Sequence, residues 1–322
     1  MFKTKKITQE LLKIDNKTPI YICGHIKADQ DSIGASIVLA EFLSHYGKNV
    51  YILLSQKDAN ILTWKPTSKF ITDKVEHSDY VFVAIDINET YRLGEFEQYY
   101  FKAHTKFNID HHQGNSTNAD FVLDVPEVSS TCEIIYTLIY RHNKNLLTKD
   151  MCEYLYAGIF TDTNGLSRRL SAHTLEIVQK LVNKKIPYAE INRLTLSLRT
   201  MYEFIALSHM VKEIVKEKHF HYLVVDKNRQ EYSKLSLNTI TKKLAEDLRK
   251  IDEIDTFIVL ILNHDNSINA KTMTNSTALA CDIAKLFGGG GHKKESGFTT
   301  NSFTVEEIVL KTNEFLEKAL KN

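Results

Sequence analysis

The first half of the chain alternates short apolar segments with segments of helical spacing, and this alternation constrains the fold more than any other feature. The apolar segments are rich in β-branched and aromatic residues, which favours buried strands. Strands are predicted at Pro19–Gly24, Asn49–Leu54, Tyr80–Asp86 and Lys106–Ile109. Helices are predicted at Ser32–Tyr46, Ser130–Tyr140, Lys149–Phe160 and His173–Asn183. Strands that alternate with helices predict an α/β fold with a doubly wound, mostly parallel sheet.

A second pattern, closer to the C-terminus, predicts a smaller α/β domain. Its predicted strands are His219–Val225, Thr256–Asn263 and Ser267–Met273. Its predicted helices are Leu237–Lys250, Ala278–Phe287 and Val305–Lys318. A chain of 322 residues is too long for one ordinary core. We therefore expect domains at residues 1–187 and 212–322, joined by a helical connector at 188–211.

The charge balance and the cysteines exclude several classes of protein. The chain has 41 basic and 40 acidic residues, whereas a protein that coats long nucleic acids would be more basic. Its four cysteines (Cys23, Cys132, Cys152 and Cys281) form no C-x-x-C pair, which argues against a disulfide scaffold or a cysteine-rich zinc site. No apolar run approaches the roughly 18 residues of a membrane span, and no signal sequence is recognisable. We therefore expect a cytoplasmic protein that binds no membrane and no long nucleic acid.

Acidic residues and histidines gather where predicted strands end. His25, Asp29 and Asp31 follow the first strand, Asp86 ends another, and Asp110-His111-His112 follows a third. Asp162 follows an apolar helical run. Each residue alone is readily explained as a helix cap or a turn. Ligands bind at the carboxyl ends of strands in open α/β sheets, however, and only cations would hold so many buried like charges together. The pattern therefore predicts a metal site.

These segments resemble the motifs of the DHH phosphoesterase superfamily. The resemblance is carried by His25-x-x-x-Asp29-x-Asp31-x-x-Gly34, by Asp86, by Asp110-His111-His112 and by Asp162, in the family's order. The later run Gly288-Gly289-Gly290-Gly291-His292 resembles the glycine-rich signature of the C-terminal domain associated with that family. The stand-alone enzymes it suggests are the nanoRNase/pAp-phosphatase subfamily and phosphodiesterases that act on cyclic di-AMP or its linear product.

The resemblance implies a role for each of these residues. One metal ion would be held by His25, Asp29 and Asp86. The other would be held by Asp31, Asp86, His111 and Asp162, with Asp86 bridging. His112 would face the substrate phosphate, and Asp110 would orient a histidine. Oxygen and imidazole donors without thiolate suit manganese or magnesium, and the imidazoles favour manganese, so two Mn²⁺ ions are expected.

The glycine-rich run predicts an anion-binding loop in the second domain. Glycine allows backbone N–H groups to approach a phosphate closely, and His292 adds a further donor. The resemblance also implies an Arg on the strand before this loop, but Met273 stands at that position. Lys271 or Arg168 could supply the missing charge; a surface role for Arg168 is the alternative.

These features together predict a manganese-dependent phosphodiesterase with its active site in a cleft between the two domains. Expected substrates are short oligonucleotides or linear or cyclic dinucleotides, cleaved to mononucleotides, with pAp as a further candidate. An inorganic pyrophosphatase-like enzyme is one alternative, although the Ser-Arg-Lys-Lys-Gln run of that family is absent. A nucleotide-binding regulator without catalysis is another. The sequence leaves open which nucleotide is the substrate and whether the protein is a homodimer.

Overall fold

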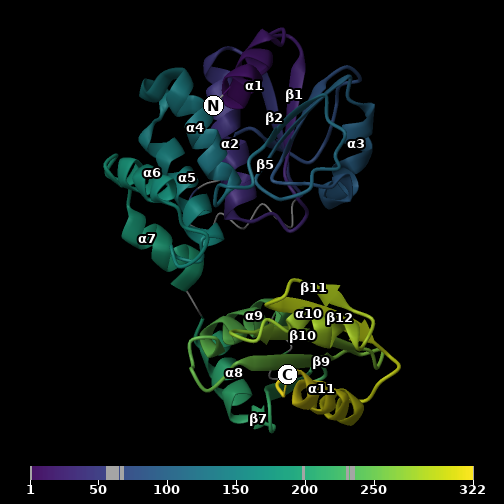
Figure 1. The fold of residues 1–322 in the computed structure, drawn as a ribbon. Helices are drawn as coiled ribbons and strands as arrows, with labels where there is room; N and C mark the ends of the chain where they lie inside the picture. The colour runs from purple at the N-terminus through teal and green to yellow at the C-terminus, as the bar shows by residue number, and fades with distance from the viewer. Residues whose placement is uncertain are drawn as a thin grey trace. The chain divides into compact units, whose positions relative to one another are not determined.

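The computed structural model describes residues 2–55, 65, 69–197, 200–229, 232 and 236–321. The chain divides into two compact units, Met1–Leu198 and Arg199–Asn322, each of which is described by itself (Figure 1). The predicted connector 188–211 contains α7 (Tyr188–Asn192), a π-helical turn (Arg193–Ser197) and α8 (Met201–Lys212). The division between the units falls inside this segment, and the boundaries 1–187 and 212–322 stay predictions.

The first unit is built around a parallel sheet. Its described strands are β1 (Pro19–Cys23), β2 (Asn49–Leu53), β3 (Ile71–Thr72), β4 (Val81–Ile85), β5 (Thr105–Asp110) and β6 (Phe121–Asp124). They lie in the order β3-β2-β1-β4-β5-β6, and every pairing between them is parallel. The chain passes from β1 through β2 to β3 at one edge of the sheet, and β4 then lies on the other side of β1. The carboxyl ends of β1 and β4 therefore flank a topological switch point, where open α/β sheets bind ligands.

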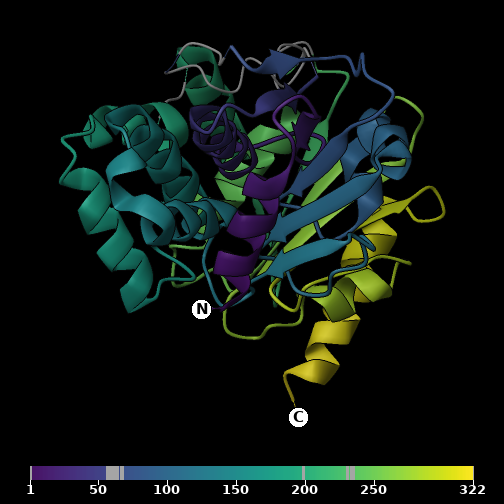
Figure 2. The same ribbon diagram turned by 90° about the horizontal axis from the view of Figure 1, so that it is seen from above.

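Helices cover both faces of this sheet, as its buried sequence requires. The helices of the unit are α1 (Phe2–Lys13), α2 (Gln30–His45), α3 (Glu97–Lys102), α4 (Thr131–Asn143), α5 (Lys149–Asp162), α6 (Ala172–Val182) and α7, with a 3₁₀ segment η2 at Thr90–Phe96 and another at Lys144–Leu146. Alternate residues of β4 point to opposite cores: Val81 and Val83 pack with α2, α4 and α5, whereas Phe82 packs with Tyr100 of α3. Figure 2 shows α4 to α6, in teal, on one side of the sheet. The predicted doubly wound, mostly parallel architecture is confirmed.

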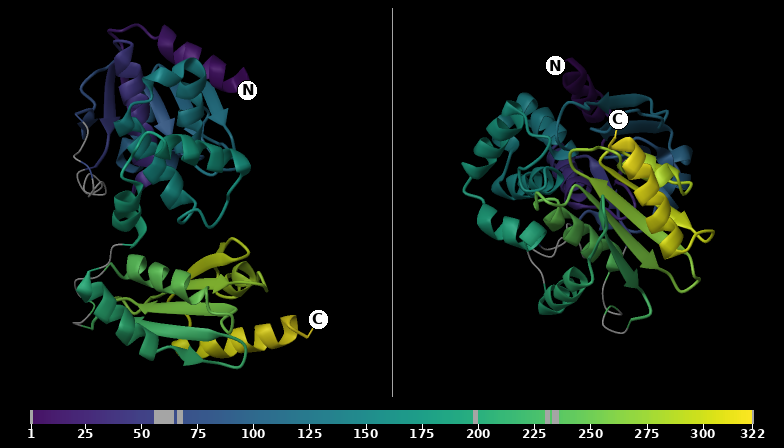
Figure 3. Two further views of the ribbon diagram at one scale, coloured as in Figure 1. Left: turned by 90° about the vertical axis from the view of Figure 1, so that its left-hand side faces the viewer. Right: turned by 60° about the horizontal axis from the view of Figure 1, so that its bottom comes forward.

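The second unit has a mixed sheet. Its strands are β7 (Val215–Lys216), β8 (His221–Asp226), β9 (Thr256–Leu262), β10 (Ile268–Thr274), β11 (Gly290–Gly291) and β12 (Glu295–Thr300). The order is β11-β12-β10-β9-β8-β7, and among the described pairings β8 with β9 alone is parallel. Its helices are α8, α9 (Leu237–Leu248), α10 (Ala280–Lys285) and α11 (Val305–Ala319). One core lies with α8 and α9, and another with α10 and α11, the yellow C-terminal helix of Figure 3.

Among the residues that the structure describes, no helix combines the length and the apolar character needed to cross a membrane.

Candidate metal centre and active site

The loop after β1 and the start of α2 carry the first group of predicted ligands. Asp29 is the N-cap of α2, and its Oδ1 accepts hydrogen bonds from the backbone N–H groups of Asp31 and Ser32, both at 3.0 Å. Because Oδ1 serves the cap, Oδ2 remains available and lies 3.6 Å from His25 Nε2. Nδ1–H of His25 donates a hydrogen bond to the carbonyl oxygen of Ile26, 2.9 Å away. Asp29 can therefore cap the helix and act as a ligand at the same time.

Asp86 lies at the centre of the cluster, directly after β4. It is 2% exposed, and its backbone has a φ of +61°, in the left-handed region. His25 Nε2 lies 3.4 Å from its Oδ2, and His111 Nε2 lies 3.5 Å from its Oδ1. A residue other than glycine with positive φ is strained, and such strain persists where the surrounding structure fixes a functional side chain. The turn at Asp86 presents each carboxylate oxygen to a different histidine.

The segment after β5 brings two histidines with different exposure. The side chain of His111 is buried, and its Nε2 lies 3.4 Å from Asp162 Oδ2 at the end of α5. The side chain of His112 is 31% exposed. Its Nδ1 lies 2.7 Å from Asp110 Oδ1, which also accepts a hydrogen bond from the His111 N–H at 2.8 Å. Asp110 therefore orients the exposed histidine and leaves Nε2 of that ring as the outward nitrogen.

The donor atoms form three overlapping groups, within each of which the atoms lie within 4.8 Å of one another. The groups are His25, Asp29 and Asp86; Asp31, His111 and Asp162; and Asp86, Asp110, His111 and His112. The first group has the residues of one predicted ligand set, and the second has Asp31, His111 and Asp162 of the other set without Asp86. His111 Nε2 lies 3.5 Å from Asp86 Oδ1.

Two carboxylate oxygens of this cluster fit a cation centre. Asp162 Oδ2 and Asp110 Oδ2 are buried without a hydrogen-bond partner among the described residues. A buried carboxylate oxygen without a donor is costly, and a bound cation removes that cost. Oxygen and imidazole donors suit a divalent ion such as manganese or magnesium. The residues present therefore fit the predicted metal ions.

The carboxylates set the protonation of the two buried imidazoles. Burial lowers the pKa of His25, but its hydrogen bonds to Asp29 and Asp86 outweigh burial and raise that pKa to about 10. Burial also opposes the charged form of His111, but Asp86 and then Asp31 raise its pKa to about 9. Both imidazoles therefore hold protons near neutral pH that a metal ion has to displace.

The three carboxylates respond differently to the same surroundings. Burial raises the pKa of Asp31 well above its ordinary value, and the neighbouring charges of Asp86 and Asp162 add to the shift. Burial raises the pKa of Asp162 to about 6, although His111 opposes the change. Burial acts in the same direction at Asp86, but hydrogen bonds from His111 and His25 outweigh it and hold the pKa of Asp86 below its usual range. Asp86 is therefore the anion around which the cluster is organised.

The N-terminus of α4 holds two of these carboxylates in place. The backbone N–H groups of Thr131 and Cys132 donate to the two oxygens of Asp31, at 2.7 and 2.8 Å. The hydroxyl of Thr131 donates to Asp86 Oδ1 at 3.0 Å. A Cβ on Gly158 of α5 would lie 3.0 Å from Asp31 Oδ1, so glycine allows the helices to meet there. No contact between Thr131 and a metal ligand was predicted from the sequence, in which the Ser-Ser-Thr-Cys-Glu run at 129–133 is the signal for this helix start.

The loop after α5 carries Arg168, a predicted substitute for the missing charge, and its neighbour Arg169. Arg168 is exposed, and its N–H donates to the carbonyl of Thr163. Arg169 acts on the cluster, because its charge is among the smaller influences that lower the pKa of Asp162. Of the two, Arg169 is the one whose charge reaches a predicted ligand, although Arg168 was the predicted substrate contact.

In the second unit the glycine run leads into β11, which is an edge strand of the sheet. Gly288 has a φ of +79°, Gly290 and Gly291 form β11, and His292 is exposed at the turn that leads to β12. Met273 is buried in the core beside α9, whereas Lys271 on the same face of β10 is partly exposed.

An arginine that the sequence analysis missed lies against this turn. Nη2 of Arg249, at the C-terminus of α9, donates to the carbonyls of Thr274 and Lys294 at 3.4 and 3.3 Å. The side chains of Lys293 and Lys294 are exposed beside it. This contact could not be predicted, because α9 and the turn are distant in sequence.

Comparison with known proteins identifies the family of the first unit. The family model described as DHH family, N-terminal domain, matches residues 19–159, which hold every predicted metal ligand except Asp162. The first unit is a DHH-family domain. The recognition of a DHH phosphoesterase, a metal-dependent hydrolase, is therefore confirmed.

Curated relatives match the chain along almost its whole length. A probable bifunctional oligoribonuclease and PAP phosphatase from Streptococcus mutans is 25% identical, with 97% of each chain covered. A protein of Thermus thermophilus named bifunctional oligoribonuclease and PAP phosphatase is 22% identical, covering 98% of this chain and 94% of the relative. The cyclic-di-AMP phosphodiesterase of Bacillus subtilis is 20% identical, and 47% of its length is covered.

Solved structures agree on the fold. An exopolyphosphatase-related protein from Bacteroides fragilis has a TM-score of 0.84 at 22% identity, with 99% of this chain and 96% of that chain covered. RecJ from Thermus thermophilus, solved in complex with Mn²⁺, has a TM-score of 0.56 at 13% identity, with 98% and 54% covered. These likenesses concern the fold alone.

Proposed function

We propose that this protein is a two-metal phosphodiesterase that cleaves short oligonucleotides or linear or cyclic dinucleotides to mononucleotides, and that manganese is its metal. The observation that carries the proposal is Asp86, whose two carboxylate oxygens face two separate groups of donors. When bound, two divalent ions would lower the pKa of a water molecule and stabilise the charge that develops on the phosphoryl group. The ligands we propose are His25, Asp29, Asp31, Asp86, His111 and Asp162.

The protein itself contributes a placed histidine to this chemistry. Asp110 is buried and accepts a hydrogen bond from Nδ1 of His112, so Nε2 is the ring nitrogen left for another partner. We assign Nε2 to the substrate phosphate, where in the imidazolium form it would donate a hydrogen bond or a proton to the leaving oxygen. The same arrangement, in which a carboxylate fixes the orientation of an imidazole, serves general acid–base catalysis in other enzymes.

We further propose that the second unit binds a phosphate of the substrate. Gly288, Gly289, Gly290 and Gly291 offer backbone groups without side-chain obstruction, and His292 is exposed beside them. Arg249 and the neighbouring lysines add positive charge on the same turn. Lys271 and Arg168 stay predicted contacts. The predicted cleft between the domains likewise stays a prediction.

Short substrates are favoured by two observations. The net charge of +1 provides no extended basic track for a long phosphate backbone. The Streptococcus and Thermus relatives are named as oligoribonucleases and PAP phosphatases, and the Bacillus relative as a phosphodiesterase of cyclic di-AMP. We infer from these names that pAp, short RNA and dinucleotides are the substrates to test first.

A substrate panel tests the proposal. The full chain with Mn²⁺ is incubated with pAp, linear and cyclic dinucleotides, a pentanucleotide, pyrophosphate, and an RNA of about 24 nucleotides at several salt concentrations. We expect mononucleotide products from the short substrates and slow cleavage of the long RNA. Rapid, salt-resistant cleavage of the long RNA would contradict the preference for short substrates. Hydrolysis of pyrophosphate alone would replace the proposal by the pyrophosphatase alternative.

A further inference from the structure

Asn108 is a fully buried amide on β5 that the proposed chemistry does not use. Its strand neighbours Phe107 and Ile109 pack into the core with α2, α4 and α5. Because side chains alternate along a strand, Asn108 points to the opposite face of the sheet, which α3 covers. A buried amide among apolar side chains is costly unless both its donor and its acceptor are bonded. The partners of Asn108 therefore indicate its role.

The donor end of this amide holds the turn that follows β4. Nδ2–H of Asn108 donates to the carbonyl oxygen of Ile87 at 2.8 Å. A backbone carbonyl can only accept, so this contact fixes which end of the amide carries the nitrogen. Ile87 directly follows Asp86, whose own N–H donates to the carbonyl oxygen of Ile109 at 3.0 Å. The backbone of β5 thus holds the turn before the Asp86 side chain, and the amide of Asn108 holds it after.

The acceptor end of the amide bonds the loop that follows the two histidines. The Asn108 oxygen accepts a hydrogen bond from Nδ2 of Asn115. Oδ1 of Asn115 in turn accepts from the N–H and the hydroxyl of Thr117, at 3.1 and 2.8 Å. In the same loop, the N–H of Ser116 donates to the carbonyl oxygen of Asn88 at 2.8 Å. This loop and the turn at residues 86–88 are therefore bonded to each other and to Asn108.

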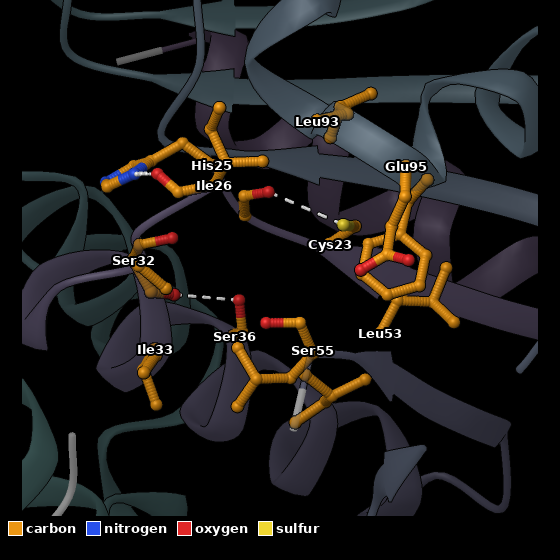
Figure 4. A pocket seen from close by; sticks show the side chains of 15 residues that line it. Cys23, His25, Ile26, Ser32, Ile33, Ser36, Leu53, Ser55, Leu93 and Glu95 are labelled. Carbon is orange, nitrogen blue, oxygen red and sulfur yellow. Dashed lines mark hydrogen bonds between the residues drawn. The ribbon is translucent and has the colours of Figure 1, made fainter. Parts of the chain in front are cut away.

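The turn determines where the two oxygens of Asp86 point. Oδ2 lies 3.4 Å from His25 Nε2, and Oδ1 lies 3.5 Å from His111 Nε2. The ring of His25 is itself held by its hydrogen bond to the Ile26 carbonyl, as Figure 4 shows. The left-handed φ of +61° at Asp86 persists only where the surrounding structure imposes it. Without a donor at the Ile87 carbonyl the turn would relax, and a carboxylate oxygen would move away from its histidine.

We propose that Asn108 is a positioning residue whose amide imposes the left-handed turn at Asp86 and so keeps one carboxylate directed at both groups of donors. The inference rests on the proposed function, because it concerns the ligand that the two ions would share. It adds to that function a residue outside the ligand set on which the pairing of the ions depends.

The substitution Asn108→Leu tests the proposal, because leucine has a similar size and forms no hydrogen bond. Calorimetry measures Mn²⁺ affinity, and electron paramagnetic resonance reports whether two bound ions share a ligand, since such ions give a spin-coupled spectrum. We expect about tenfold weaker Mn²⁺ affinity and the spectrum of isolated ions in place of the coupled one. We also expect kcat to fall by about tenfold while KM changes little.

Two further variants separate positioning from stability. Asn115→Ala keeps the hydrogen bond from Asn108 to Ile87 and should weaken Mn²⁺ affinity less than Asn108→Leu does. Thr8→Val is the matched control, because it replaces another buried, hydrogen-bonded side chain of the same unit, on α1, which carries no predicted ligand. We expect Thr8→Val to lower the melting temperature without changing Mn²⁺ affinity or the spectrum.

The outcomes distinguish this inference from the proposed function. Loss of stability in Asn108→Leu with unchanged Mn²⁺ affinity and spectrum would overturn the positioning role, even if nucleotides are hydrolysed. A crystal structure of Asn108→Leu in which Asp86 keeps its positive φ and both histidine contacts would also overturn it. If the wild type bound two coupled ions and cleaved no nucleotide, the phosphodiesterase would fail, whereas a loss of coupling in Asn108→Leu would still support the role of Asn108.

Discussion

The two units carry their functional groups in opposite ways. In the first unit, Asp31, Asp86 and Asp110 are buried among other charges, where burial without compensation is costly. In the second unit, His292, Lys293 and Lys294 are exposed on a glycine-rich turn. The buried cluster suits ions that stay in place, as proposed, whereas the exposed turn suits a group that would arrive and leave with each turnover. Substitutions in the two places should therefore change different measured quantities.

The largest expected effect is that of Asp86→Asn. The substitution removes the charge that faces both donor groups, so we expect activity to fall by at least about a thousandfold and manganese binding to weaken at both sites. Metal content by elemental analysis and kcat with excess Mn²⁺ are the measurements. A variant that retains two tightly bound ions and near-normal turnover would contradict the two-metal assignment.

The second-largest expected effect is the pH dependence of metal binding. The pKa values of about 10 for His25 and about 9 for His111 mean that the metal-stripped protein carries these protons near neutral pH. A metal ion binds the neutral imidazole, so apparent affinity should rise with pH. The rise is about a hundredfold from about pH 6 to about pH 8 if one proton is displaced per ion. Calorimetry in buffers of different ionisation enthalpy measures the proton release, and an affinity independent of pH would show that these imidazoles are not ligands.

The substitution Thr131→Val tests how the first unit holds the carboxylate of Asp86 in position. The change removes the hydroxyl that bonds Asp86 and keeps the backbone N–H that bonds Asp31. We expect about tenfold weaker Mn²⁺ affinity, in the range usual for groups that orient metal ligands. Thr131→Ser retains the hydroxyl and should restore the affinity. Equal losses in both variants would instead indicate a packing defect.

The smallest expected effect belongs to the second unit. Arg249→Gln should raise KM by about fivefold and leave kcat and metal content nearly unchanged, because the charge lies on the turn proposed for phosphate. Lys250→Gln, the adjacent exposed residue, is the control. A fall in metal content in Arg249→Gln would contradict the separation of roles between the units.

The extent to which the fold could be predicted depended on burial. The strands β1, β2, β4 and β5 were predicted almost to the residue because parallel strands covered on both faces are continuous apolar runs. The strand β6 was missed, since it is short and half exposed, and β12 was missed because its sequence is largely polar. A strand that is short, as β6 is, or largely polar, as β12 is, resembles a loop in sequence.

The residues of the candidate site could likewise be predicted only in part. The predicted carboxylates and histidines lie together because each follows an element whose end is recognisable in the sequence. Thr131 and Arg249 could not be found in this way, because their contacts join segments distant in sequence. Thr131 bonds Asp86, and Arg249 bonds Lys294, and no local pattern specifies either pair.

The left-handed backbone of Asp86 also bears on how such a protein can evolve. Asparagine and aspartate are, apart from glycine, among the residues that most readily adopt this conformation. An Asp-to-Asn replacement, which one nucleotide change in the codon achieves, keeps the turn and the shape of the side chain while removing its charge. The backbone that positions the central ligand thereby leaves a single-mutation route from a hydrolase to a folded descendant that binds nucleotides without cleaving them.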